Sequence, residues 1–206
     1  MVAEGPPAPA AALHESHRRL FFALWPDESM REAMAQAVHE ATRALLESGT
    51  GRGGRPVPTG NLHVTLAFLG AVPQRRLPEL AELAREAARL PRSGAAITGP
   101  PASPLELAFD RIEYWRDARL LCALPAEVPA PVAALARSLQ ELLVARGFAP
   151  DLKPFRPHVT VMRKVVRAAA LDTMHPVGWR FAELALVESR TLPEGALYSV
   201  VGSFPL

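Results

Sequence analysis

One four-residue pattern occurs twice in this chain, 95 residues apart: His63-Val64-Thr65-Leu66 and His158-Val159-Thr160-Val161. Each copy lies in a run rich in β-branched and apolar residues, which is typical of a β-strand. Side chains of a strand alternate between its two faces. Each copy is therefore predicted to place a histidine and a threonine on one face. Apolar side chains, including Phe68 in the first run, are predicted to face the core.

A polar pair on an otherwise apolar strand lowers stability unless something satisfies or uses it. A single His-x-Thr segment is most often just a half-buried, hydrogen-bonded pair. The chain of 206 residues has only six histidines, however, and two of them occur in matching contexts. Two copies therefore favour one shared active site over two unrelated structural pairs.

Composition limits the class of protein. A chain of 206 residues suits one domain of two lobes, or two small domains. It contains no run of 18 apolar residues, so no membrane span is expected. Cys122 is the one cysteine, which excludes an internal disulfide and is compatible with a reducing cytoplasm. We expect a cytoplasmic protein, a flexible Ala- and Pro-rich tail over residues 1–17, and a single domain over residues 18–206.

Charge is distributed unevenly, although the net charge is only +2. Positive side chains surround the second His-Thr pair, with no carboxylate between Asp151 and Asp172: Lys153, Arg156, Arg163, Lys164 and Arg167. Such a cluster can be a solvated face, but beside two histidines it favours a site for an anion.

Hydrophobic periodicity predicts an α+β fold. Strands are expected at residues 18–25, 62–69, 105–112, 119–124, 157–162, 179–188 and 197–204, and residues 113–118 form a turn with Tyr114 and Trp115. Helices are expected after Asp27, near Pro78 and after Pro131, whereas residues 49–58 read as a loop. Each half of the chain offers strands and helices around one His-Thr strand. This pattern indicates a bilobal, pseudo-symmetric duplication, with antiparallel sheets facing a central cleft and helices packed outside.

Two histidines and two threonines suit chemistry at phosphorus. One imidazole can be a general base for the attacking oxygen while another is a general acid for the leaving oxygen. A threonine hydroxyl can donate to a non-bridging phosphoryl oxygen without the repulsion of a carboxylate. A cyclic phosphate on a ribose is the natural substrate for such a pair. No metal or other cofactor is expected, since His-Glu-x-x-His, paired cysteines and carboxylate clusters do not occur in the sequence.

These motifs resemble the two-histidine (2H) phosphoesterase superfamily, and closely its bacterial RNA 2′,3′-cyclic phosphodiesterases, also called 2′-5′ RNA ligases. The resemblance spans about residues 18–206. It is carried by Arg19-Leu20-Phe21-Phe22-Ala23-Leu24, Gly54-Arg55-Pro56-Val57, residues 61–70 around His63, and residues 154–161 around His158. It implies metal-independent opening of RNA 2′,3′-cyclic phosphate ends to a 2′-phosphate, and joining of RNA ends through a 2′-5′ bond in reverse.

The resemblance also implies roles for individual residues. His63 would protonate the O3′ leaving group, His158 would activate water, and Thr65 and Thr160 would hold the phosphate. Arg163, five residues after the second histidine, would bind substrate, although strict alternation puts it on the face opposite His158.

Three further residues are expected at the substrate. The first-strand aromatic is Phe21 or Phe22, which face opposite ways, so that one lines the cleft and the other belongs to the core. Arg156 of the basic cluster is also expected to bind substrate. The partner is then an RNA or oligonucleotide end bearing a 2′,3′-cyclic phosphate, and we expect the protein to be a monomer.

Two alternatives come from other classes of protein. A nucleotide- or RNA-binding module could keep the same cleft without chemistry, and it would retain its ligand unchanged. A metal-binding protein could use His63 and His158 as ligands, and a chelator would then abolish its activity or stability.

Overall fold

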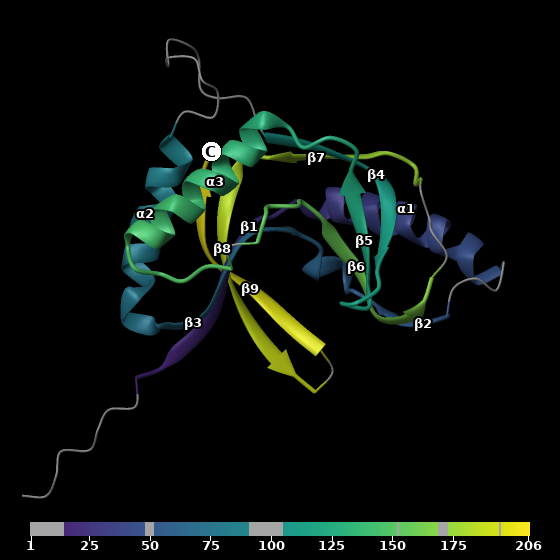
Figure 1. Cartoon of the computed structure of the whole chain (residues 1–206), viewed down its shortest axis with the longest axis horizontal. Helices are drawn as coiled ribbons and strands as arrows, with labels where there is room; N and C mark the ends of the chain where they lie inside the picture. Colours follow the sequence, from purple (N-terminus) through teal and green to yellow (C-terminus); the bar gives the residue numbers. More distant parts are fainter. Residues whose placement is uncertain (1–14, 48–51, 91–104, 152, 169–172, 194) are drawn as a thin grey trace, which may run out of the picture.

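The computed structural model describes residues 15–47, 52–90, 105–151, 153–168, 173–193 and 195–206. Within these ranges the strands form two antiparallel sheets, one of four strands and one of five (Figure 1). The four-stranded sheet has the order β3 (Val64–Pro73), β1 (His17–Leu24), β8 (Glu183–Leu192) and β9 (Gly195–Pro205). The five-stranded sheet has the order β2 (Arg52–Pro56), β6 (Val159–Arg167), β5 (Leu120–Pro125), β4 (Leu105–Trp115) and β7 (Val177–Phe181).

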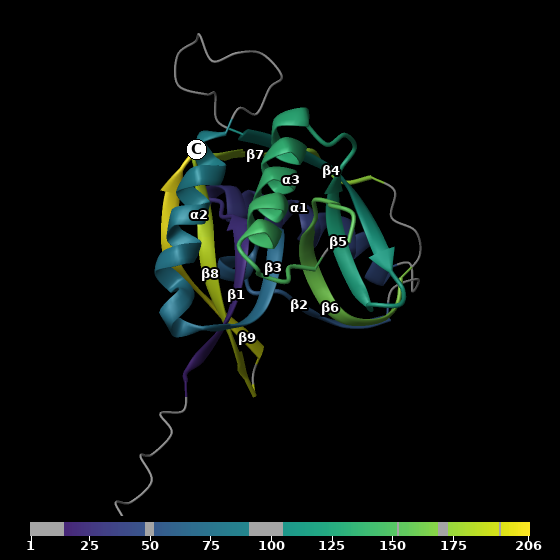
Figure 2. The ribbon, with the colours of Figure 1, turned by 60° about the vertical axis from the view of Figure 1, so that its left-hand side comes forward.

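In the part of the chain that the structure describes, three α-helices cover the outer faces of the sheets: α1 (Glu28–Glu47), α2 (Leu77–Arg89) and α3 (Ala130–Ala145). Asp27 caps α1 as predicted, because its Oδ1 accepts a hydrogen bond of 2.9 Å from the Met30 amide. Helix α1 packs on the five-stranded sheet, where Trp179 Nε1 donates to the Met30 carbonyl. Helices α2 and α3 lie together beside the four-stranded sheet (Figure 2). The predicted α+β fold is confirmed.

The two sheets do not correspond to the two halves of the sequence. Strand β2 and helix α1 come from the first half of the chain but join the five-stranded sheet. Strands β8 and β9, at the C-terminus, join the four-stranded sheet instead. Each sheet thus contains one His-Thr strand, and each is completed by strands from the other half of the chain.

Three predicted elements differ most from the structure. The single strand expected at residues 179–188 is divided at Ala182: β7 pairs with β4 in one sheet and β8 pairs with β1 in the other. Strand β4 continues to Trp115, so the turn to β5 begins only at Arg116. Strand β2 forms within the predicted loop because β6 supplies an open edge, where pairing depends on the neighbouring backbone rather than on local propensity.

The main core lies between the sheets and their helices. Leu20, Phe22 and Leu24 of β1 belong to it, whereas Phe21 and Ala23 lie on the opposite face in a small second cluster with Val187. Among the described residues, four buried side chains form that second cluster, so this face of the four-stranded sheet is less thoroughly packed. The predicted tail at residues 1–17 falls largely outside the described residues and stays a prediction, although β1 itself begins at His17.

Candidate active site

His63 lies directly before β3, after a short 3₁₀ turn at Thr59–Asn61. Its Nδ1 lies 2.6 Å from the Asn61 carbonyl oxygen. A carbonyl can only accept, so Nδ1 carries the proton that forms this hydrogen bond. Nε2 lies 3.1 Å from Thr65 Oγ1 and remains for proton transfer. The turn therefore sets both the tautomer and the direction of the half-buried imidazole.

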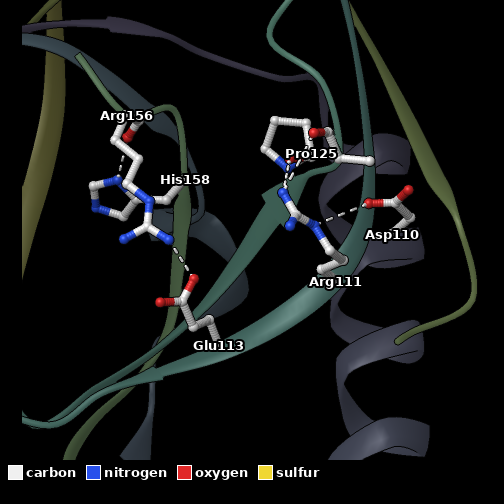
Figure 3. A network of polar contacts seen from close by, with 7 residues as sticks. Asp110, Arg111, Glu113, Pro125, Arg156 and His158 are labelled. Atoms are coloured by element: carbon white, nitrogen blue, oxygen red, sulfur yellow. Dashed lines mark hydrogen bonds and ion pairs between the residues drawn. The ribbon is translucent and has the colours of Figure 1, made fainter. Parts of the chain in front are cut away.

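His158 repeats this arrangement directly before β6. Its Nδ1 donates to the Arg156 carbonyl over 2.8 Å, again two residues upstream (Figure 3). Thr160 pairs across the sheet with Cys122, whose thiol also contacts the threonine side chain. Burial raises the pKa of the Cys122 thiol to about 12, so the thiol stays protonated and only packs in the protein interior.

A β-bulge brings Arg163 onto the face of His158 and Thr160. Cys122 is paired with Thr160, but the adjacent Leu121 is paired with Met162, which leaves Val161 as an extra residue in β6. Because of this extra residue, the Arg163 side chain lies on the same face of β6 as Thr160, whereas strict alternation predicted the face opposite His158. Its Nη2 lies 3.4 Å from the hydroxyl of Tyr198 on β9, in the other sheet.

The same irregularity occurs in β3. Phe22 pairs with Ala67, whereas Ala23 pairs with Thr65, so Leu66 is the extra residue. Both Leu66 and Ala67 are buried in the main core, and the next residue, Phe68, turns outward. The prediction that Phe68 faces the core was therefore wrong: it packs on the small second cluster, with the Arg19 guanidinium 4.8 Å from its ring centre.

Aromatic rings surround His63. Phe21 lies 4.9 Å away between ring centres, Trp25 stacks at 5.4 Å with an interplanar angle of 22°, and Tyr198 meets the imidazole edge-on at 5.2 Å. Phe21 is 3% exposed, so it supports the imidazole and offers little surface for a nucleobase. Phe22 was expected as an alternative contact, but it is fully buried in the main core because alternation turns it away from His63.

An aromatic ring and a guanidinium group lie close to His158 at the five-stranded sheet. The Trp115 ring lies 4.4 Å from the imidazole, and the Arg156 guanidinium lies 5.0 Å from the Trp115 ring centre. Arg156 also forms an ion pair with Glu113, which balances its charge (Figure 3). Binding of substrate by Arg156 stays a prediction, and in this structure its guanidinium already has a carboxylate partner.

Burial and positive charge lower the pKa of both histidines. Burial is the largest cause at His63 and brings its pKa to about 4, with further contributions from Arg163 and His158. Burial is also the main cause at His158, followed by the charges of Arg156 and Arg163. Both imidazoles are therefore neutral in the free protein at neutral pH. A neutral His158 can accept a proton directly, whereas His63 must first gain one before it can donate.

A cavity of about 300 Å³ lies away from the two histidines, between α1 and β6. Its lining is mainly apolar and includes Val38, Pro56, Met162 and Val165. Within the described part of the chain, no group of three or more His, Cys, Asp or Glu side chains is placed to hold a metal ion.

Three site neighbours were not predicted. Trp25 shares a face with Phe21 and Ala23, so strand alternation alone could have indicated it. Trp115 was assigned to a turn, which hid its contact with His158. Tyr198 comes from the last strand, and no local signal links it to His63 or Arg163.

Comparison with known proteins gives one family and several close relatives. The model of the 2′-5′ RNA ligase superfamily matches residues 26–191. An RNA 2′,3′-cyclic phosphodiesterase of Thermus thermophilus is 30% identical over 194 residues, covering 91% of this chain and 90% of the relative. One of Escherichia coli is 31% identical over 168 residues, covering 80% and 82%. The crystal structure of E. coli LigT complexed with 3′-AMP superposes with a TM-score of 0.75 at 25% identity, covering 93% and 99%.

Proposed function

Because the chain belongs to the 2′-5′ RNA ligase superfamily, we propose that it hydrolyses RNA ends carrying a 2′,3′-cyclic phosphate. The observation that carries this function is the paired arrangement of His63 and His158. Each histidine has its Nδ1 tied to a backbone carbonyl, and each has a threonine two residues later. Arg163 lies near enough to both imidazoles to lower the pKa of each.

The proposed reaction assigns the two histidines the roles that the resemblance to the family implies. His158 takes a proton from water, whose oxygen attacks phosphorus in line with the P–O3′ bond. The P–O3′ bond breaks, and His63 gives its Nε2 proton to the departing O3′. The product is a 2′-phosphate. Thr65 and Thr160 donate to non-bridging oxygens, while Arg163 balances the charge on the phosphoryl group.

His63 needs a proton source for this role. Its pKa of about 4 leaves it neutral in the free protein at pH 7. A bound cyclic phosphate brings a negative charge, which favours the imidazolium and opposes the effect of Arg163. Substrate binding therefore raises the pKa of His63 and promotes uptake of the proton that the leaving oxygen needs.

The reverse direction, the cellular location and the oligomeric state are part of the same proposal. In reverse, the two histidines exchange roles and a 2′-5′ bond forms between RNA ends. A buried, unpaired Cys122 agrees with a protein that works in the reducing cytoplasm, and the proposed oligomeric state is a monomer. No helix in the described ranges combines the length and apolar character that crossing a membrane requires.

The test is incubation of the purified protein and EDTA with a short RNA ending in a 2′,3′-cyclic phosphate. We expect only the 2′-phosphate product, and separation of the 2′- and 3′-phosphates identifies it. An unchanged RNA that stays bound would indicate the binding module instead. Activity lost to EDTA and regained with metal would indicate that the histidines are metal ligands.

A further inference from the structure

Arg55 on β2 lies directly opposite Arg163 on β6. The next pair in this register joins Pro56 to Met162, and both of these residues line the cavity beside α1. Because strand side chains alternate, Arg55 and Arg163 project from the other face of the sheet. That face carries His158 and Thr160, so Arg55 extends the positive charge of the site toward the edge of the sheet.

This pairing of two like charges needs an explanation. Like charges directly opposite each other in an antiparallel pair are destabilising. Two other arginines on or next to this sheet have carboxylate partners: Arg156, upstream of β6, pairs with Glu113, and Arg180 on β7 pairs with Glu106. In the described ranges, neither Arg55 nor Arg163 has an ion pair with a carboxylate, and both side chains are exposed. A bound anion would relieve the repulsion between them.

We propose that Arg55 binds the phosphodiester that joins the terminal nucleotide of the substrate to the nucleotide before it. This inference rests on the proposed function, in which Arg163 binds the cyclic phosphate itself. Directly opposed residues in antiparallel strands lie about 5 Å apart at their Cα atoms. Two long guanidinium side chains from such positions can each contact one of two consecutive phosphates on a single strand. The preferred substrate is then an oligonucleotide and not a mononucleotide.

The test compares two substrates in the wild type and in Arg55→Ala. One is a nucleoside 2′,3′-cyclic phosphate, which has no second phosphate, and the other is a trinucleotide with the same cyclic end. We expect kcat/KM for the trinucleotide to fall about tenfold, as for loss of one charge-assisted hydrogen bond. The value for the mononucleotide should stay within about twofold. Arg137→Ala, an equal change of charge at an exposed position of α3, is the control and should change neither value.

A second readout separates failure of this inference from failure of the proposed function. Binding of a fluorescent RNA pentamer with a 2′-phosphate end, followed by anisotropy, needs no turnover. Loss of one phosphate contact on a single strand should lower the slope of log affinity against log salt by about 0.7. If the wild type turns over neither substrate, the proposed function fails, and a lower slope in Arg55→Ala still supports the second-phosphate site.

Three results would overturn the role of Arg55. These are an equal loss of kcat/KM on both substrates, no loss on either, and an unchanged salt slope. Folding is checked by thermal melting at low salt, where removal of one like charge should leave the melting temperature unchanged or raise it. Arg55→Gln, which keeps a polar side chain but removes the charge, should reproduce the results of Arg55→Ala.

Discussion

The guanidinium of Arg163 on β6 lies 3.4 Å from the Tyr198 hydroxyl on β9, and this contact joins the two sheets beside the two candidate catalytic histidines. The contact depends on the bulge at Val161, which turns Arg163 to the face of His158. The same guanidinium lowers the pKa of both His63 and His158. Arg163 therefore both connects the two sheets and lowers the pKa of the two candidate catalytic histidines.

Removal of Arg163 should raise the pKa of both imidazoles, because a nearby positive charge disfavours the imidazolium form. NMR titration of the histidine ring protons in Arg163→Ala measures this directly, with Arg163→Lys as the control that keeps the charge. An unchanged pKa for His63 and His158 in Arg163→Ala would show that the charge of Arg163 does not reach them.

Both histidines should be needed for turnover. His63→Ala and His158→Ala should each lower kcat by at least about 100-fold, since each removes one step of proton transfer. Thr65→Ala and Thr160→Ala should each cost less, because a hydroxyl only stabilises charge on the phosphoryl group. Circular dichroism should show a folded protein in all four. Near-normal kcat in a histidine variant, or a greater loss in a threonine variant, contradicts these roles.

The pH dependence of kcat/KM should have an acidic maximum. In the free protein His63 must be protonated and His158 neutral, and both have a pKa below 6.5. The active form is thus most abundant below pH 6.5, and kcat/KM should decline above it. The profile of kcat describes the bound complex, where the substrate phosphate raises the pKa of His63, so its maximum should lie at higher pH. A kcat/KM maximum above pH 7 is the result that would falsify this assignment.

Burial of neutral His63 should make stability depend on pH. The pKa is about 4 in the folded protein and near 6.5 in the unfolded chain, so the unfolded state binds more protons between these values. The contribution of His63 to the free energy of unfolding is complete above pH 6.5. It decreases as the pH falls toward 4, by at most about 3 kcal/mol. Urea unfolding at a series of pH values measures this loss. In His63→Asn, the free energy of unfolding should decrease less steeply as the pH falls. If it decreases as steeply as in the wild type, other groups cause the decrease.

Gly54 should be intolerant of a side chain. Its φ is +110°, and an added Cβ would lie 2.9 Å from Met162 Cε. Gly54→Ala should therefore lower the free energy of unfolding by about 1 kcal/mol or more, chiefly through backbone strain at this positive φ, because the Met162 methyl group is the flexible end of its side chain and can move. Gly60→Ala is the matched control, because nothing lies within 4 Å of a Cβ at that position. Equal stability of the two variants would show that β2 can shift to accept the methyl group.

Local sequence determined the elements that carry the site. Alternation and helical periodicity predicted the strands at the two His-Thr segments and the helices after Asp27, near Pro78 and after Pro131. The structure confirms these elements, although each histidine lies directly before its strand and α3 already begins at Ala130. The same alternation separated Phe21 from Phe22, because a period of two depends only on the local backbone. The pattern also selected His63 and His158 as candidates, and their catalytic roles stay predictions.

Tertiary structure decided what depends on neighbours distant in the chain. The bulges at Leu66 and Val161 appear only when the pairing partners are known, and they turn Phe68 and Arg163 to faces that alternation did not predict. The division of residues 179–188 between two sheets, the pairing of β2 with β6, and the approach of Tyr198 to His63 are likewise non-local. Register between strands is set by packing across a whole sheet, and the sequence of a single strand does not specify which strand pairs with it.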